Sequence, residues 1–290
     1  MTELLQAVVN GLQMGALYAL VAVGLAIIWG LMEMVNFAHG EFMMLGMFGA
    51  WWLSSALGLD PLIAMVPVAL AMYGLGVLTY RVLMRRVQRG DTFAQIFATV
   101  GLLLFLQNGV VAAFTSDYRF VNDTVLTRLS GVHVSVLGIR LGIPLLIAGL
   151  IALALFLLLY LLIDRTELGL ALQATSEDRE AAMLMGVRPA RMFAVAWGLG
   201  AALVAVAGVI LANFFSVYPQ VGLQFTVLAY AIVALGGFGS VLGTLIAALL
   251  VGVVQSVTTV YLPPAFKDAF VFGSYLLIGL LRPQGLFGRF

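Results

Sequence analysis

Residues 164–191 read DRTELGLALQATSEDREAAMLMGVRPAR and form a long polar segment between two strongly apolar blocks. No Asp, Glu, Lys or Arg occurs in residues 141–163 before the segment or in residues 192–266 after it. Because charged side chains are costly inside a bilayer, a polar segment between two such blocks is expected at a membrane surface. We interpret residues 164–191 as a lever at that surface and the apolar blocks as parts of a pore-forming body.

This polar segment carries the signals of a short helix. Thr175 precedes Asp178 with the spacing of an N-terminal capping box. Gly186 stands where a left-handed cap ends a helix, and Pro189 follows closely. The expected helix of about three turns is too short to cross a bilayer. It is either an ordinary surface helix that joins two spans or a helix that presses into a partner's groove. Its apolar stripe comprises Ala181, Ala182, Leu184 and Met185, and its polar side carries Arg179 and Glu180.

The composition is that of a polytopic membrane protein. Of 290 residues, 63% are hydrophobic and only 9% are charged, whereas soluble domains carry about 25% charged residues. The net charge of +1 gives no sign of a nucleic-acid partner, and the absence of cysteine excludes disulfides and thiol chemistry. The start Met1-Thr2-Glu3 lacks the basic region of a secretory signal, so we expect the first apolar segment to be retained as a span.

Nine charge-free runs are candidate spans. They cover residues 5–30, 42–59, 61–80, 92–114, 141–163, 192–211, 223–237, 240–260 and 269–281. We therefore predict one all-α transmembrane domain over residues 1–290, with about eight or nine membrane-spanning helices, some of them short or broken. The run 223–237 is broken by Gly236, Gly237 and Gly239 before the next run begins. Such glycines indicate either a half-helix at a transport path or close packing of helices through small residues.

The basic residues predict the orientation. Ten arginines are placed on one side of the membrane: Arg81, Arg85, Arg86, Arg89, Arg165, Arg179, Arg188, Arg191, Arg282 and Arg289. Only Arg119, Arg128, Arg140 and Lys267 then lie on the other side, which satisfies the positive-inside rule. This arrangement puts the N-terminus outside, and it puts the C-terminus and residues 164–191 in the cytoplasm.

Residues 114–140 become the main external loop. Within it HVSVLGIR alternates like a strand, and Gly131 is expected to turn a hairpin. The loop is either a docking surface for a partner outside the cell or a plain lid.

A cluster of polar residues interrupts the apolar sequence at MEMVNFAHGEFMML, residues 32–45. Asn36, His39 and Glu41 are its main members, with Glu33 just before them. His39 and Glu41 do not share a helix face, and a metal site needs further ligands, so we expect neither catalysis nor metal binding here. The cluster either lines a path at a break between helices or is solvated at the cytoplasmic interface.

The chain contains a single lysine, Lys267. A phosphate-binding loop requires Gly-Lys followed by Ser or Thr, and this combination does not occur. If ATP drives the protein, a separate subunit must hydrolyse it.

Several of these residues resemble a known family. Asn36-Phe37-Ala38-His39-Gly40-Glu41-Phe42 resembles the signature of LivH-type permeases of branched-chain amino acid ABC importers. Glu180-Ala181-Ala182 followed by Gly186 is similar to the EAA motif of ABC importer permeases, and residues 174–182 are close to its LivH-type version. Residues 235–240 (LGGFGS) and 282–288 (RPQGLFG) are similar to late motifs of that family. The resemblance covers nearly the whole chain.

This resemblance implies a transport subunit in the bacterial cytoplasmic (inner) membrane that imports leucine, isoleucine, valine or related neutral amino acids. The implied partners are a second, LivM-like permease subunit, two ATP-binding subunits, an external substrate-binding protein and membrane lipid, but no nucleic acid. ATP and magnesium would be used by the partners, and this chain would bind no cofactor. The residues implied in ATPase coupling are Glu177, Arg179, Glu180, Ala181, Ala182, Leu184, Met185 and Gly186. The residues expected along the substrate path are Asn36, His39, Gly40, Glu41, Gly236 and Gly237.

Two other classes of protein are alternatives to this one. An ATP-independent facilitator or secondary carrier for small solutes such as urea or amides would fit the composition, but a carrier needs an ion-coupling residue and residues 192–266 contain no charge. A membrane-embedded enzyme would need converging acid, base or metal-binding groups, and only residues 33–41 come near that requirement.

Overall fold

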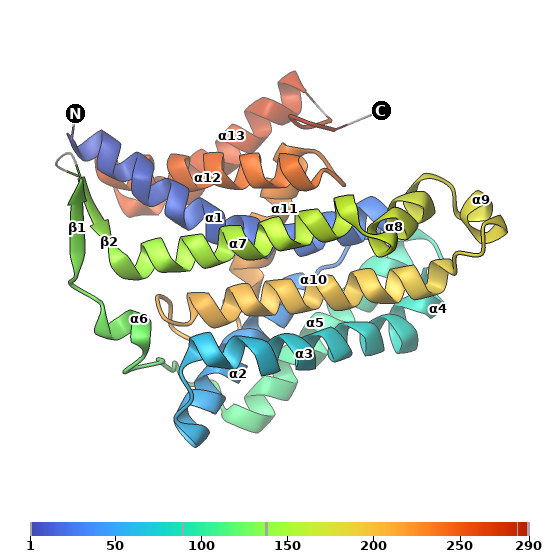
Figure 1. Cartoon of the computed structure of the whole chain (residues 1–290), viewed down its shortest axis with the longest axis horizontal. Helices are drawn as coiled ribbons and strands as arrows, with labels where there is room; N and C mark the ends of the chain where they lie inside the picture. The colour runs from blue at the N-terminus through green and yellow to red at the C-terminus, as the bar shows by residue number, and fades with distance from the viewer. Residues whose placement is uncertain (1, 89, 137–138, 283, 289–290) are drawn as a thin grey trace.

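The computed structural model describes residues 2–88, 90–136, 139–282 and 284–288 as a bundle of helices with one small hairpin (Figure 1). Every charge-free run in the sequence is occupied by a helix, which confirms an all-α polytopic architecture. These helices are α1 (Thr2–Met32), α2 (His39–Leu57), α3 (Pro61–Thr79), α5 (Thr92–Phe114), α7 (Ile143–Arg165), α10 (Pro189–Leu211), α11 (Val221–Gly236), α12 (Val241–Tyr261) and α13 (Lys267–Leu281). The shorter elements are η1 (Tyr80–Met84), α4 (Arg85–Val87), α6 (Val125–Arg128), β1 (His133–Val136), β2 (Ile139–Gly142), α8 (Glu167–Glu177), α9 (Arg179–Leu184) and η2 (Pro264–Phe266).

Six helices among the described residues are long and apolar enough to cross a membrane. They cover Glu3–Met32, Pro61–Val87, Thr92–Phe114, Ile143–Arg165, Pro189–Leu211 and Val241–Tyr261. The 16 residues of α11 and the 15 residues of α13 fall short of the roughly 20 that a straight crossing requires. The predicted total of eight or nine spans is therefore not confirmed by helix length and composition.

The centre of the bundle is formed by α1 and α10. In their most apolar windows 83% and 78% of the residues are buried, compared with 11% for α5 at the periphery. Lipid gives little hydrophobic drive for helix association, so close contact through small residues is the main way to hold such helices together. Gly24 of α1 faces Gly200 of α10, where an added side-chain carbon would lie 2.7 Å from the Gly200 carbonyl oxygen.

Two non-helical segments, residues 33–38 and 212–220, return the chain into the bundle. The first brings the start of α2 to the middle of α1, because the His39 Nε2 lies 2.8 Å from the carbonyl oxygen of Val21. The second brings the start of α11 against the start of α2, where the Gly40 N–H donates to the Thr226 Oγ1 over 2.9 Å. Both α2 and α11 thus begin inside the bundle rather than at its ends.

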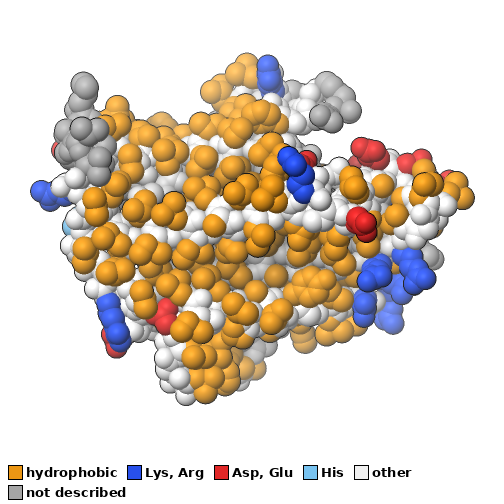
Figure 2. Space-filling view, in the orientation of Figure 1, with side chains coloured by type: hydrophobic (Ala, Val, Ile, Leu, Met, Phe, Trp, Pro, Cys, Tyr) orange, Lys and Arg blue, Asp and Glu red, His pale blue; other side chains and the backbone are white. Residues whose placement is uncertain are grey.

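Most charged side chains in Figure 2 lie toward the two ends of the bundle, and the surface between them is mainly apolar apart from basic side chains in the upper middle of the view. Arg81, Arg85, Arg86 and Arg179 line one cavity. The helices α4 and α9, which carry three of these arginines, lie at the right-hand end in Figure 1. At the opposite end the backbone of Arg140 is hydrogen-bonded to the Gln6 side chain close to the N-terminus. This separation matches the two groups of basic residues expected from the sequence, although Arg89 and Arg289 lie outside the described residues.

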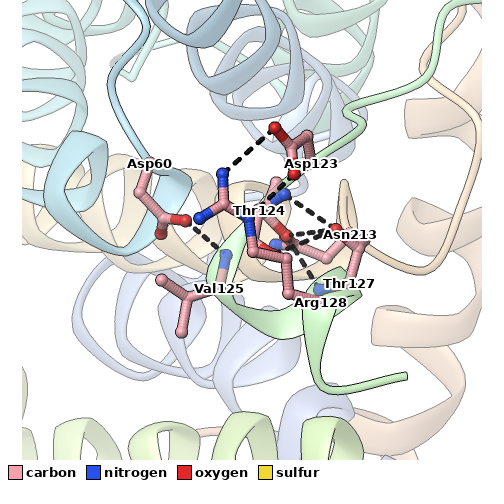
Figure 3. A network of polar contacts seen from close by, with 7 residues as sticks. All are labelled: Asp60, Asp123, Thr124, Val125, Thr127, Arg128 and Asn213. Atoms are coloured by element: carbon pink, nitrogen blue, oxygen red, sulfur yellow. Dashed lines mark hydrogen bonds and ion pairs between the residues drawn. The ribbon is translucent and has the colours of Figure 1, made fainter. Parts of the chain in front are cut away.

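The segment after α5 is tied to several parts of the bundle (Figure 3). The Val125 N–H donates to the Asp60 Oδ2 (2.6 Å) at the start of α3, and the Thr124 Oγ1 donates to the Asn213 Oδ1 (2.8 Å) after α10. Arg128 donates to Asp123 and thereby lowers the pKa of that exposed carboxyl group. The segment is therefore fixed to the end of the bundle at separate points.

Strand structure in this segment is confirmed, but HVSVLGIR contributes to two strands rather than one, and the predicted turn at Gly131 is wrong. Strands β1 and β2 pair antiparallel, with Ser135 opposite Arg140. Gly131 has φ +95° yet lies before β1, where it closes the turns that follow α6. The strands connect through residues 137–138, which lie outside the described residues.

We predict that Gly252→Val destabilises the chain, because a side-chain carbon at Gly252 would lie 2.7 Å from the Gly15 Cα in the contact between α12 and α1. Overpacking of this kind costs about 1–3 kcal/mol. The matched control is Gly101→Val on α5, where no atom lies within 4 Å of an added carbon. Both variants are made as fluorescent fusions and heated, and the fraction that remains folded is measured on a size-exclusion column. Equal melting temperatures for the two variants would contradict the packing described.

Candidate functional site

The polar cluster Asn36–Glu41 lies inside the protein. Asn36, His39 and Glu41 are each at most 1% exposed, so the interpretation that they are solvated at the cytoplasmic interface is wrong. The contact of His39 with Val21 places the cluster about halfway along α1. The alternative interpretation, a break between helices lined by polar groups, describes the geometry found here.

Residues from α5 and α11 complete the cluster. The Asn36 N–H donates to the Tyr230 hydroxyl (2.6 Å), and the Gly40 N–H donates to the Thr226 Oγ1 (2.9 Å). The Gln107 Nε2 donates to the Glu41 Oε1 over 3.0 Å. Non-helical backbone at membrane depth requires such partners, because no water is available in the hydrocarbon region.

Two buried polar atoms of the cluster have no hydrogen-bond partner within the part of the chain that the structure describes. They are the Oε2 of Glu41 and the Nδ2 of Asn36. A buried carboxylate oxygen and a buried amide N–H without partners are destabilising unless another group satisfies them. Both atoms belong to residues that are fully buried.

Three residues of the cluster were not predicted as site residues from the sequence: Gln107, Thr226 and Tyr230. One feature of the sequence could have identified them. All three are polar residues inside charge-free runs, where polar side chains mark function or packing by default. Thr226 and Tyr230 are also four residues apart, so they share a face of α11.

The glycines expected on the same path lie elsewhere. Gly222, at the start of α11, faces Gly40, and Gly236 stands 14 residues further on at the opposite end of this helix. At 1.5 Å per residue this separates the two positions by about 21 Å. Gly236 packs on Gly243, and Gly237 packs on Gly288, so both glycines serve close backbone packing.

The two late motifs that sequence analysis singled out are brought together at that end. The Leu286 N–H donates to the Leu235 carbonyl oxygen (2.9 Å), and the Phe287 N–H donates to that of Gly236 (3.1 Å). Pro283 of the second motif lies outside the described residues.

The polar segment 164–191 forms two helices rather than one. Asp178 adopts an extended conformation between α8 and α9, and its Oδ1 accepts hydrogen bonds from the Glu180 and Ala181 N–H groups (2.8 and 3.0 Å). The predicted capping role of Thr175 is therefore wrong, because Thr175 lies within α8 and donates to the Ala171 carbonyl oxygen (2.6 Å). The predicted helix of about three turns is reduced to the six residues of α9.

The predicted C-terminal cap at Gly186 is confirmed. Gly186 has φ +87°, its N–H donates to Met183, and the Val187 N–H donates to Ala182. This pair of hydrogen bonds defines a Schellman motif, which needs a residue that tolerates positive φ. Pro189 then starts α10, so only four residues separate α9 from the central helix.

The apolar residues of α9 divide into two groups. Ala182 is buried against the bundle, whereas Leu184 and Met185 are 89% and 85% exposed. Glu177, Arg179, Glu180, Ala181 and Gly186 are also exposed. Two large apolar side chains are therefore exposed next to each other at the tip of a capped helix.

Arg179 points back toward the bundle rather than outward. Its guanidinium carbon lies 5.0 Å from the ring centroid of Phe193 on α10. Together with Arg81, Arg85 and Arg86 it lines a cavity of about 730 Å³ beside α9. The lining of this cavity is thus strongly basic.

Comparison with known proteins adds to this geometry. Residues 7–279 match the family model described as "Branched-chain amino acid transport system / permease component". The chain is 32% identical to the high-affinity branched-chain amino acid transport system permease protein BraD of Pseudomonas aeruginosa, over 98% of this chain and 96% of the relative. It is 30% identical to the LivH permease proteins of Salmonella typhimurium and Escherichia coli K12, with the same coverage. No solved structure is a significant match.

We predict that Asp178→Ala loosens α9, because it removes the acceptor for two N–H groups, and the loss of an N-cap costs about 1 kcal/mol. Hydrogen exchange followed by mass spectrometry should show several-fold faster exchange in residues 180–187. Asp178→Asn is the matched control, since asparagine caps equally well. Identical exchange in the alanine variant and the wild type would contradict the assigned cap.

Proposed function

The chain belongs to the family of permease components of branched-chain amino acid transport systems, and from this premise we propose that it is the membrane subunit of an ATP-driven importer. The proposed substrates are leucine, isoleucine, valine or related neutral amino acids, which are the class named for the relatives. The observation that carries the coupling part of the proposal is the exposed apolar tip of α9, held by caps at both ends and continued directly into α10.

In this proposal α9 is the docking point for an ATP-hydrolysing subunit. Leu184 and Met185 would enter a pocket of that subunit, while Glu180 and Ala181 lie beside them on the exposed surface. Desolvated apolar anchors of this kind supply most of the binding energy at an interface. The neighbouring arginines would attract acidic groups of the partner. ATP and magnesium would bind to the partner and not to this chain.

Movement of α9 would be transmitted through α10. Only four residues separate the two helices, and the Schellman motif fixes the angle between them. Along its length α10 contacts α2 at Gly208, where an added side-chain carbon would lie 3.1 Å from the Met43 carbonyl carbon. Rigid, closely packed helices move as bodies, so a shift of α10 would reach the start of α2 and the Asn36–Glu41 cluster.

The substrate path is proposed to run past the starts of α2 and α11. Asn36, His39, Gly40 and Glu41 lie there beside the middle of α1. The Glu41 Oε2 and the Asn36 Nδ2, which have no partner among the described residues, support a role in binding a zwitterion. Gly236 and Gly237 would act only indirectly, by packing the far end of α11.

The orientation and subunit composition belong to the same proposal. The end with α9 and the arginine cavity would face the cytoplasm, and the N-terminus and the β1–β2 hairpin would lie outside. If α2, α11 and α13 are membrane segments in addition to the six long helices, the total is the predicted nine. A second permease subunit, two ATP-binding subunits and an external substrate-binding protein would complete the transporter.

We predict that Glu180→Lys and Leu184→Asp each reduce leucine uptake at least about tenfold, because they place a reversed or new charge at the docking surface. Radiolabelled uptake is measured in cells that depend on this transporter, and the amount of chain in the membrane should be unchanged. Glu167→Lys is the matched control, since Glu167 is also an exposed acidic residue in the first turn of a helix, α8. Unchanged uptake in both α9 variants would refute ATPase coupling through α9.

Gly186→Trp should also abolish uptake, because a non-glycine residue with φ near +87° costs about 1–2 kcal/mol and distorts the link from α9 to α10. Gly186→Asn should retain most of the uptake, since asparagine tolerates this conformation. Equal uptake in the two variants would show that the backbone conformation at Gly186 does not matter for transport.

A further inference from the structure

A second polar region lies between α1, α11, α12 and α13, separate from the Asn36–Glu41 cluster. These helices and Phe215 enclose a cavity of about 240 Å³. Its lining combines five polar side chains with an apolar wall of three phenylalanines, two valines and one leucine. The polar residues are Tyr18, Gln224, Gln255, Lys267 and Asp268.

The polar side chains of this cavity form a chain that leads from its floor to its mouth. Tyr18, only 6% exposed, donates its hydroxyl proton to the Gln255 Oε1 (2.8 Å). The Gln255 Nε2 donates in turn to the Asp268 Oδ1 (3.3 Å). Lys267 and Asp268 themselves are exposed, so the cavity has a buried hydroxyl at its floor and opposite charges at its mouth.

Lys267 stands in an unfavourable position for a structural residue. It is the first residue of α13, and a cation at a helix N-terminus is repelled by the helix dipole. The ion pairs found among the described residues are Arg128–Asp123 and Arg165–Asp164, so neither Lys267 nor Asp268 is paired there. The ammonium group and the positive end of α13 together favour an anion at this mouth.

We propose that this cavity binds the substrate as a zwitterion with an apolar side chain, an inference that rests on the proposed function. Lys267 and the start of α13 would bind the α-carboxylate, Asp268 and Gln255 would bind the α-ammonium group, and the apolar wall would hold the side chain. Charge-assisted hydrogen bonds of both signs within one small cavity select an amino acid over a neutral amide or a fatty acid.

The position of the cavity suits an entry site. Gln224 and Phe225 lie in the first turns of α11, next to Thr226, which is bonded to Gly40 of the inner cluster. Lys267 and Asp268 follow the end of α12, and by the positive-inside rule they lie toward the outer face. A solute that leaves this cavity inward therefore meets the polar groups at the starts of α2 and α11.

Photo-crosslinking with photo-leucine, a diazirine analogue of leucine, tests the site in membrane vesicles that contain the full chain. We expect labelling of peptides that span residues 224–228 and 267–272, and we expect excess leucine to displace it. Leucinamide, which lacks the carboxylate, and 4-methylpentanoate, which lacks the ammonium group, should displace it at least about tenfold less well. Leucine-displaceable labelling confined to other residues, or none at all, would overturn the proposal.

Variants of Lys267 and Asp268 test whether these two side chains bind the charged groups of the substrate. Lys267→Met and Asp268→Asn should each raise the concentration of photo-leucine needed for half-maximal labelling about tenfold. Arg140→Met is the matched control, because the groups of Arg140 that bond to Gln6 belong to its backbone. Unchanged labelling in both variants would refute the roles of the charged pair, and size-exclusion profiles verify folding.

Failure of this site and failure of the proposed function give different results. Leucine uptake that is lost in Glu180→Lys, combined with absent labelling of the cavity, would refute the cavity and leave the importer function intact. Labelling of the cavity together with uptake that is unchanged in Glu180→Lys would support the cavity as a binding site and count against ATPase coupling through α9.

Discussion

The contact between the starts of α2 and α11 is the constraint on which the rest of the structure depends. Residues 33–38 and 212–220 leave helical geometry inside an apolar bundle, and their backbone groups must find partners within the protein. Gly40 and Gly222 allow the two helices to meet backbone to backbone, which brings the Gly40 N–H to Thr226. A side chain at either glycine would separate the helices and leave these groups without partners.

This constraint also explains why the polar cluster is where it is. Because α2 starts at the middle of α1, the first turn of α2 delivers His39 and Glu41 to a depth that a full-length crossing helix would fill with apolar residues. The same arrangement leaves α11 only 16 residues long and frees its first turns to line the cavity with Gln224 and Phe225. The Asn36–Glu41 cluster and the part of the cavity that α11 lines therefore both depend on the close contact between Gly40 and Gly222.

The sequence predicted those features that depend on local patterns. Charge-free runs located every long helix, since burial in a membrane excludes charge along the whole of a span, and Gly186 was correctly predicted as a cap because positive φ is a local requirement. Features that depend on distant contacts were missed. Thr175 and Asp178 are both residue types that cap helices, so local preference alone did not decide between them. The Asn36 N–H is bonded to Tyr230, almost 200 residues away, and no local pattern predicts that contact.

The substrate-path prediction shows the same division between local and distant information. Asn36, His39, Gly40 and Glu41 were grouped by a contiguous motif, and the structure keeps them together. Gly236 and Gly237 were added because glycines interrupt the run, but this pattern cannot distinguish a half-helix from close packing. Their neighbours Gly243 and Gly288 show that they serve packing.

The central claim is that α9 joins this chain to a separate ATP-hydrolysing subunit. Because the chain contains no cysteine, a single cysteine at Leu184 provides one defined site for a photoactivatable cross-linker. The full chain is cross-linked in its native membrane and purified in mild detergent, and the attached subunit is identified by mass spectrometry together with an ATPase assay. We expect a covalent product with a nucleotide-binding subunit from the cysteine at Leu184, and none from a control cysteine at Leu57, which is also exposed and is the last residue of α2. A chain that purifies alone, shows no ATPase activity and still passes leucine in liposomes would contradict it.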